Sequence, residues 1–74
     1  MNYGSDGLRR QFLSECCRNN IHVVIYTMNG FQLKGFILGF DESVLVVRQS
    51  DGKQSMIYRY AISTIVPDCS IEIA

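Results

Sequence analysis

The chain has 74 residues, a formal net charge of zero at pH 7 and an apolar content of 47%. That apolar share is ordinary for a folded protein and excludes a disordered chain, and the length allows a single domain. The zero net charge excludes nucleic-acid binding by bulk positive charge. Any such binding would need charge gathered on one surface, or base stacking and hydrogen bonds.

Membrane, secretion and metal signals are absent from the sequence. No apolar run approaches the ~20 residues that span a membrane, and the first residues lack the basic start and apolar run of a signal peptide. We therefore expect a cytoplasmic protein. Cys16, Cys17 and Cys69 are too few for an even disulfide framework, so we expect free thiols. Together with His22 they match no structural zinc spacing, and apolar packing on a helix face explains the adjacent pair better.

The first predicted element is a helix over residues of about 6–18. Ser5 or Asp6 is suited to cap its start, and Asn19-Asn20 is suited to end it. One apolar stripe has helical spacing and comprises Leu8, Phe12, Leu13, Cys16 and Cys17. This spacing predicts a helix that packs one face on the rest of the domain.

Beyond the helix the sequence becomes β-branched and aromatic. It predicts five short antiparallel strands within residues 21–67, and a short tail over 68–74. Asn29-Gly30 and Asp51-Gly52 each lie between two such runs, and predict tight hairpins in which both turn residues have positive φ. The expected strands are 21–28, 31–40, 43–49, 54–60 and 61–66.

The second predicted strand changes its apolar phase. Phe31 and Leu33 are at odd positions, whereas Phe36, Leu38 and Phe40 are at even positions, and the strand contains Gly35 and Gly39. A phase change at a glycine predicts a bulge or sharp bend, which curls a sheet into a small open barrel. Edges of so short a barrel would pair with another chain. Pairing one edge with the opposite edge of a neighbour must close into a ring or grow without limit, and we expect the ring.

The sequence offers little for catalysis. It has one histidine, no Ser-His-Asp or Cys-His spacing, and no glycine-rich phosphate loop before a helix. Asp41 and Glu42 are adjacent, so on an extended strand they point apart and cannot act as a carboxylate pair. We favour Asp41 as a turn residue that bonds its own backbone over direct contact with RNA. We therefore expect no enzyme, no cofactor and no small-molecule substrate.

Aromatic residues beside basic ones are the candidates for binding. Phe40 lies at a predicted strand end, and Arg59 and Tyr60 lie at a strand junction. Aromatic rings and guanidinium planes hold splayed single-stranded bases, and each stack contributes ~1–3 kcal/mol. From composition alone, packing of Phe40 and Tyr60 inside the core is the more common outcome.

Two sequence blocks, in this order, resemble the Hfq family of bacterial Sm-like proteins over roughly residues 8–67. One block runs from Asn29-Gly30 through Gly39-Phe40-Asp41, and the other is Tyr58-Arg59-Tyr60-Ala61-Ile62-Ser63-Thr64. The resemblance implies a Sm-like fold, a homo-hexameric ring, and single-stranded RNA (small regulatory RNA and mRNA) as partner in post-transcriptional regulation. It further implies that uridine-rich RNA binds at the pore face and adenine-rich RNA at the opposite face.

The resemblance also implies roles for individual residues. It implies a pore-face set in which Phe40 stacks a uracil that Arg59 and Tyr60 also contact; the set comprises Arg9, Arg10, Phe40, Asp41, Arg59 and Tyr60. The implied opposite-face set comprises Tyr26, Asn29, Gly30, Phe31, Leu33, Lys34, Gln54, Ser55 and Thr64. The resemblance also implies that Arg18 lies at the outer rim, where some members help RNAs to anneal. A solvated helix terminus with no role in binding explains Arg18 equally well.

This chain departs from the family pattern at the pore face. Arg59-Tyr60 stands where the family usually has lysine and histidine, and Arg9-Arg10 stands where it commonly has glutamine and aspartate. The positive charge is kept or increased, while the base-reading glutamine and the imidazole are lost. Two alternatives therefore stay open: a Sm-like ring that serves as a protein scaffold with altered RNA binding, and a barrel subunit that docks through the helix bearing Cys16-Cys17.

Overall fold

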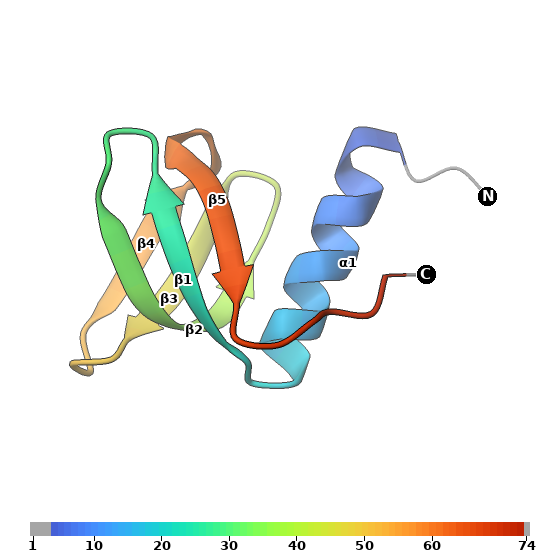
Figure 1. Cartoon of the computed structure of the whole chain (residues 1–74). Helices are drawn as coiled ribbons and strands as arrows, with labels where there is room; N and C mark the ends of the chain where they lie inside the picture. Colours follow the sequence, from blue (N-terminus) through green and yellow to red (C-terminus); the bar gives the residue numbers. More distant parts are fainter. Residues whose placement is uncertain (1–3, 74) are drawn as a thin grey trace.

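One helix precedes a five-stranded antiparallel sheet in the computed structural model, which describes residues 4–73 and their side chains from residue 7 onward (Figure 1). The elements are α1 (Gly4–Arg18), β1 (His22–Thr27), β2 (Gln32–Phe40), β3 (Val44–Gln49), β4 (Gln54–Tyr58), the 3-10 turn η1 (Arg59–Ala61) and β5 (Ile62–Pro67). The strand order is β4-β3-β2-β1-β5. The predicted fold class, a helix followed by a bent five-stranded sheet, is therefore confirmed.

The sequence predicted the C-terminal end of α1 correctly but not its N-terminal cap. The helix begins at Gly4, so Ser5 and Asp6 lie within its first turn instead of preceding it as a cap. At the other end, Asn20 has a φ of 55°. The Asn20 amide donates to the Cys17 carbonyl and the Ile21 amide to the Cys16 carbonyl, at 3.3 and 3.0 Å. This is a Schellman stop with asparagine in the left-handed position, as the Asn19-Asn20 pair predicted.

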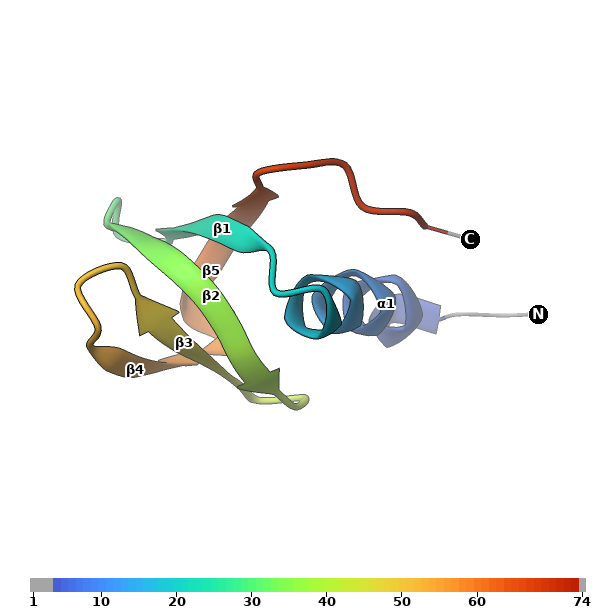
Figure 2. The same ribbon diagram turned by 90° about the horizontal axis from the view of Figure 1, so that it is seen from below.

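The helix contributes only its C-terminal half to the core. Leu13 and Cys16 are fully buried, whereas Leu8 is 52% exposed. Figure 2 shows why, because the N-terminal end of α1 points away from the strands. Leu8 therefore does not belong to the packed stripe, contrary to the sequence prediction. The shared core comprises Leu13, Cys16, Val23, Ile25, Ile37, Leu45, Val47 and Ile57.

Cys16 acts as an apolar residue. Burial, reinforced by the nearby Cys69 and Cys17 thiols and by Glu15, raises the pKa of the Cys16 thiol. A thiol with a raised pKa stays protonated at neutral pH and is a poor nucleophile. Packing on a helix face is therefore the role of this side chain.

The two glycine hairpins are wider than the sequence predicted. Gly30 and Gly52 have φ values of 91° and 92°, but neither Asn29 nor Asp51 is among the described residues with positive φ. The Gly30 amide donates to the Thr27 carbonyl at 3.1 Å, and the Gly52 amide to Gln49 at 2.8 Å. Each loop is thus an ordinary β-turn followed by a left-handed glycine that forms a bulge. The prediction that both turn residues have positive φ was wrong.

Strand β2 bends sharply where it crosses the sheet, as Figure 2 shows. Its pairing with β3 shifts register between Ile37 and Gly39, so the bulge predicted from the phase change is confirmed. Gly35 allows the close approach of the two strands, because a Cβ there would lie 2.0 Å from the Arg48 carbonyl oxygen. Gly39 has open space around a Cβ, so steric fit requires glycine only at Gly35.

Strands β4 and β5 are the two edges of the sheet. They follow one another in sequence through η1, so this turn joins opposite edges and curls the sheet toward a barrel. Apolar side chains stay exposed on both edges, including Met56 at 57% on β4 and Val66 at 45% on β5. Unpaired, partly apolar edges of this kind are surfaces on which another strand can add.

Candidate nucleic-acid interface

The turn between β2 and β3 is organised by Asp41. Its Oδ1 accepts hydrogen bonds from the amides of Ser43 and Val44, at 2.7 and 2.9 Å. These two bonds, assisted by the Arg9 charge, hold the pKa of Asp41 below its ordinary value. The carboxylate is therefore ionised at neutral pH and serves as the turn residue that the sequence predicted.

Two arginines converge on the backbone of this turn. Arg9 Nη2 donates to the Asp41 carbonyl at 3.1 Å, and Arg59 Nη1 donates to the Glu42 carbonyl at 3.4 Å. The Arg59 backbone amide also donates to the Ser43 carbonyl at 2.7 Å. Three consecutive carbonyls thus accept hydrogen bonds from the helix and from η1, two from guanidinium groups and one from a backbone amide. Residues separated by half the chain are brought together here.

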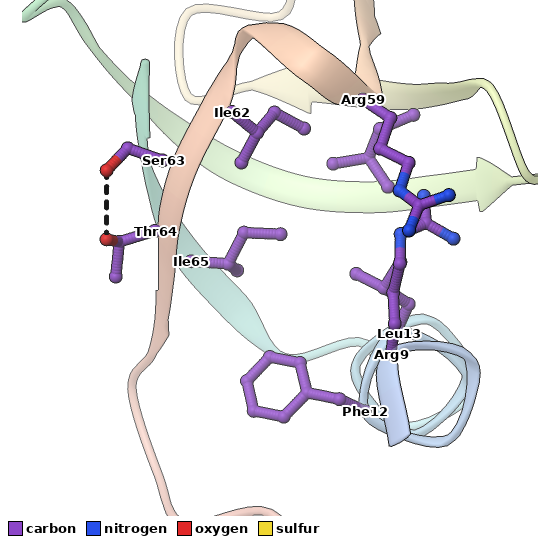
Figure 3. A pocket seen from close by; sticks show the side chains of 9 residues that line it. Arg9, Phe12, Leu13, Arg59, Ile62, Ser63, Thr64 and Ile65 are labelled. Carbon is purple, nitrogen blue, oxygen red and sulfur yellow. Dashed lines mark hydrogen bonds between the residues drawn. The ribbon is translucent and has the colours of Figure 1, made fainter. Parts of the chain in front are cut away.

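A first hollow of about 330 Å³ lies between α1 and β5 (Figure 3). Arg9 and Arg59 approach each other at its mouth, while Phe12, Ile62 and Ile65 form an apolar wall. Ser63 and Thr64 turn their hydroxyls to the outer side of β5, 3.3 Å apart. The hollow therefore combines an apolar interior with positive charge at the rim.

A second hollow of about 620 Å³ surrounds Tyr60 and is lined by Glu42, Ser43, Tyr58, Arg59 and Tyr60. The Tyr58 and Tyr60 rings are stacked, with centroids 5.6 Å apart and planes 16° from parallel. Tyr60 is 80% exposed and Tyr58 50% exposed. Tyr60 is therefore not a core residue, which decides one of the alternatives that composition left open.

A third hollow contains Phe40. It has a volume of about 390 Å³ and is lined by Arg10, Phe40, Asp41, Glu42 and Ser43. Phe40 is only half-buried and packs against the core, so it partly fills the interior and partly faces this hollow. Phe40 and the Arg59-Tyr60 pair line different hollows within one chain. They meet only at the shared wall formed by Glu42 and Ser43.

The hairpin between β1 and β2 forms the other candidate region. Tyr26 is 38% exposed at the end of β1, and Phe31 is 67% exposed just beyond Gly30. The Thr27 hydroxyl fixes the loop, since it donates to Asn29 Oδ1 at 2.6 Å and accepts from the Phe31 amide at 3.0 Å. Two aromatic rings are thereby held at the surface by a hairpin with its own hydrogen bonds.

The remaining opposite-face residues divide into two groups. Thr64 on β5 pairs directly with Tyr26, and Lys34 on β2 is exposed, whereas Leu33 packs partly into the core. Gln54 and Ser55 lie on β4, at the far edge of the sheet from β5. Ser55 accepts a hydrogen bond from the Gln49 side chain at 2.6 Å. One chain alone therefore does not gather this set into a single site.

A backbone contact joins the two candidate regions. The Met28 amide, in the hairpin loop, donates to the Ala61 carbonyl of η1 at 2.8 Å. The loop that carries Phe31 and the turn that carries Tyr60 are thus tied at the start of β5.

Arg18, the rim residue, is exposed at the end of α1. It forms an ion pair with Glu15, and Asn19 Nδ2 donates to the same carboxylate at 3.0 Å. This is the geometry of a solvated helix terminus, where a neutralising partner reduces the charge available to a ligand.

Within residues 4–73, no group of three or more His, Cys, Asp or Glu side chains is arranged to hold a metal ion. No helix in the same part of the chain has both the length and the apolar character needed to cross a bilayer. Cys16, Cys17 and Cys69 are free thiols.

Two residues of these hollows were missed by reading the sequence. Tyr58 was seen as part of a strand and Glu42 as half of an unproductive carboxylate pair. A signal for Tyr58 existed, because alternate residues of a strand share a face and Tyr58 and Tyr60 are two apart. No local pattern could have placed Glu42 beside Tyr60, since strands β3 and β4 lie between their turns.

Comparisons with known proteins agree with this geometry. The family described as "Hfq protein" matches residues 8–72. The "RNA-binding protein Hfq" of Alkaliphilus metalliredigens is 53% identical over 60 residues, covering 81% of this chain and 74% of the relative. That of Moorella thermoacetica is 52% identical over 67 residues, covering 90% and 79%. A crystal structure of "the pleiotropic translational regulator, Hfq" superposes with a TM-score of 0.75 at 36% identity, covering 78% of this chain and 95% of its own.

Proposed function

This chain belongs to the Hfq family of RNA-binding proteins, and from that premise we propose that it is a ring-forming RNA chaperone. It binds single-stranded small regulatory RNAs and mRNAs in the cytoplasm and acts in post-transcriptional regulation. Uridine-rich RNA binds the pore face and adenine-rich RNA the opposite face. The protein needs no cofactor and is not an enzyme.

The observation that carries RNA binding is the exposed aromatic and guanidinium surface around the β2–β3 turn. Tyr60 presents most of its ring to solvent, and Arg9 and Arg59 converge beside it. Stacking of bases on aromatic rings contributes binding energy that depends little on the RNA sequence, and guanidinium groups contact the phosphates. Such a surface suits an unstacked strand of RNA better than a duplex, whose bases are not accessible to rings.

A homo-hexameric ring is the assembly that we propose. Strand β4 of one subunit would pair with β5 of the next, because these are the two open edges. The exposed Met56 of β4 and Val66 of β5 are apolar side chains on these two edges that such a contact would help to cover. Such a contact is heterologous, so it either closes into a ring or extends without limit, and we propose the closed ring. The number six comes from the family resemblance.

The ring would complete the adenine-rich site. Within one chain, Gln54 and Ser55 lie on the opposite edge from Thr64 and Tyr26. Pairing β4 with a neighbour's β5 would bring the first two residues beside the neighbour's second two. The site for adenine-rich RNA therefore lies between subunits, with Tyr26 and Phe31 as its stacking rings and Asn29, Gly30, Leu33 and Lys34 around them.

The uridine-rich site would lie at the pore face and use Arg9, Arg10, Phe40, Asp41, Arg59 and Tyr60. Phe40 keeps an exposed part of its ring in the hollow that Arg10 lines. Arg9 and Arg10 raise the positive potential near the pore without the base-reading amide that the family commonly has. Phosphate contacts fix affinity and register but carry no sequence information. We therefore expect weaker discrimination between bases here than in a typical member.

A scaffold function is the second candidate, in which the ring binds proteins and RNA binding is altered. It is favoured by the replacement of the family's usual histidine by Tyr60 and of its usual glutamine by Arg9. Exposed apolar residues that ring closure would not cover could then receive a protein partner. Retention of Phe40, Tyr26, Gly30 and Thr64, and of positive charge at Arg59, favours the RNA chaperone.

Filter binding with oligo-U and oligo-A, together with light scattering, tests the proposal. We expect a stable hexamer at micromolar concentration that binds both RNAs. A hexamer that binds neither RNA would support the scaffold instead. A stable monomer or dimer would contradict the ring, and with it the intersubunit site for adenine-rich RNA.

A further inference from the structure

The hollow around Tyr60 has features that a site for uracil does not need. The stacked pair of Tyr58 and Tyr60 has one ring face covered and another open, since Tyr60 is 80% exposed. A flat base added to the open face would continue the stack. Offset stacking of aromatic rings contributes beyond simple area burial, and a two-ring purine covers more of such a face than a one-ring pyrimidine.

The polar groups of the same hollow indicate which base would bind there. Glu42 is exposed and lines the hollow together with Ser43 and Arg59. An ionised carboxylate only accepts hydrogen bonds, and two parallel donors suit it best. Guanine presents two adjacent donors on its Watson–Crick edge, N1–H and the N2 amine. Uracil presents one N–H between two carbonyls, which would face the carboxylate with repulsion.

Adenine and cytosine fit this hollow less well than guanine. Each has one exocyclic amine next to a ring nitrogen that only accepts, so one carboxylate oxygen of Glu42 would lack a donor. An unmatched polar group in a partly enclosed contact costs binding energy. Arg59 adds a donor on the same wall, which suits the O6 carbonyl of guanine or a phosphate of the chain.

We propose that this hollow is a guanine subsite of the RNA-binding surface, with the base stacked on Tyr60 and its N1–H and N2 amine donated to Glu42. The subsite rests on the proposed RNA binding and adds a base preference to it. It would make this chain favour uridine-rich RNA that contains a guanosine over an uninterrupted uridine run. Tyr60 supplies the platform, and Glu42 determines the specificity.

Fluorescence anisotropy with four short RNAs tests the subsite. The probes are an oligouridine and the same strand with one internal guanosine, inosine or adenosine. Inosine keeps N1–H and lacks the N2 amine, so it removes one of the two donors. We expect guanosine to bind on the order of tenfold more tightly than uridine, and inosine and adenosine to lose most of that gain.

Variants separate the two contacts. Glu42→Gln should abolish the preference for guanosine over inosine while oligouridine still binds, and Tyr60→Leu should weaken every probe that stacks there. Glu72→Gln is the matched control, because it removes an exposed carboxylate from the tail, outside the hollow. The series is repeated in Tyr26→Ala, so that binding at the opposite face does not contribute.

The outcomes distinguish this inference from the function on which it rests. Oligo-U and oligo-A binding with equal affinity for guanosine and inosine strands overturns the guanine subsite alone. A guanosine preference that survives Glu42→Gln overturns it as well. Failure of wild type to bind any RNA overturns both the RNA-binding function and the subsite.

Discussion

The hairpin at residues 27–31 and the turn η1 both present aromatic rings, but they are stabilised in different ways. The hairpin holds Phe31 with hydrogen bonds that its own neighbours make, chiefly through the Thr27 hydroxyl. The turn η1 depends on partners far away in sequence, because Arg59 bonds to residues 42 and 43. Local chemistry therefore specifies the first region, and the tertiary fold specifies the second.

This difference indicates that side chains in η1 can change binding specificity with little loss of fold stability. The η1 backbone is held by the Arg59 amide and the Ala61 carbonyl, so replacing the Tyr60 side chain leaves these backbone contacts in place. Tyr60 and Arg59 stand where the family usually has other residues, whereas the hairpin keeps the family's Asn-Gly. Each prediction below tests that contrast.

The largest expected effect is on fold stability, at strand β2, because both the hairpin and the turn contacted by η1 depend on this strand. Strand β2 begins at the hairpin and ends at the turn that η1 contacts, and its Gly35 lies against the β3 backbone. Gly35→Ala should destabilise the fold by about 3 kcal/mol, because a Cβ would overlap the Arg48 carbonyl. Gly39→Ala is the control and should change stability by less than about 0.5 kcal/mol. Urea unfolding measures both, and equal stability of the two variants would contradict the close-approach role.

The next largest expected effect is on RNA binding, where a substitution in each region should weaken the binding of a different RNA. Tyr26→Ala should weaken oligo-A binding by ~1–3 kcal/mol per occupied site, because it removes a stacking ring. Oligo-U binding should stay nearly unchanged in that variant. Tyr60→Ala should show the reverse pattern. Filter binding measures both, and equal losses for both RNAs in either variant would show that the two regions are not separate sites.

A smaller effect concerns salt and base selection at the pore face. Arg9→Gln should reduce the slope of log affinity against log salt for oligo-U by roughly 0.7, the share of one phosphate contact on a single strand. Tyr60→His should increase discrimination between oligo-U and oligo-C. A salt series for wild type and both variants provides the comparison. If wild type already discriminates strongly and neither variant changes anything, the substituted residues are outside the site.

The smallest effect is on stability and depends on pH. The folded pKa of Asp41 is lowered, so its ionised form stabilises the β2–β3 turn above the unfolded pKa. This contribution is lost as pH falls through the folded pKa. Asp41→Asn should therefore be less stable than wild type at neutral pH, with a gap that closes in acid. Thermal unfolding at a series of pH values measures it, and a gap independent of pH would exclude the charge as the cause.

Much of the fold was predictable because its signals are local. The Asn19-Asn20 stop, the five strands and the bulge near Gly39 follow from residue types at fixed spacing, and the structure contains all three. The hairpin types were not predictable from the same residues. Asn-Gly and Asp-Gly allow two positive φ values but do not require them, and here only the glycine adopts one.

The candidate site was less predictable, because it is assembled from separated parts of the chain. The pattern identified Arg59 and Tyr60 but not their neighbours Tyr58 and Glu42, which only the folded chain brings beside them. The exposure of Leu8 was missed for a related reason. Helical spacing predicts which residues share a face, but not how far along the helix the sheet extends.

The most direct test of two separate RNA sites on one ring is a competition experiment by analytical ultracentrifugation. Labelled oligo-U is bound to the wild-type protein, and unlabelled oligo-A is added to saturation. The account predicts a hexamer that carries both RNAs at once, with the labelled oligo-U retained. Complete displacement of oligo-U by oligo-A would contradict it, because the two RNAs would then share one site.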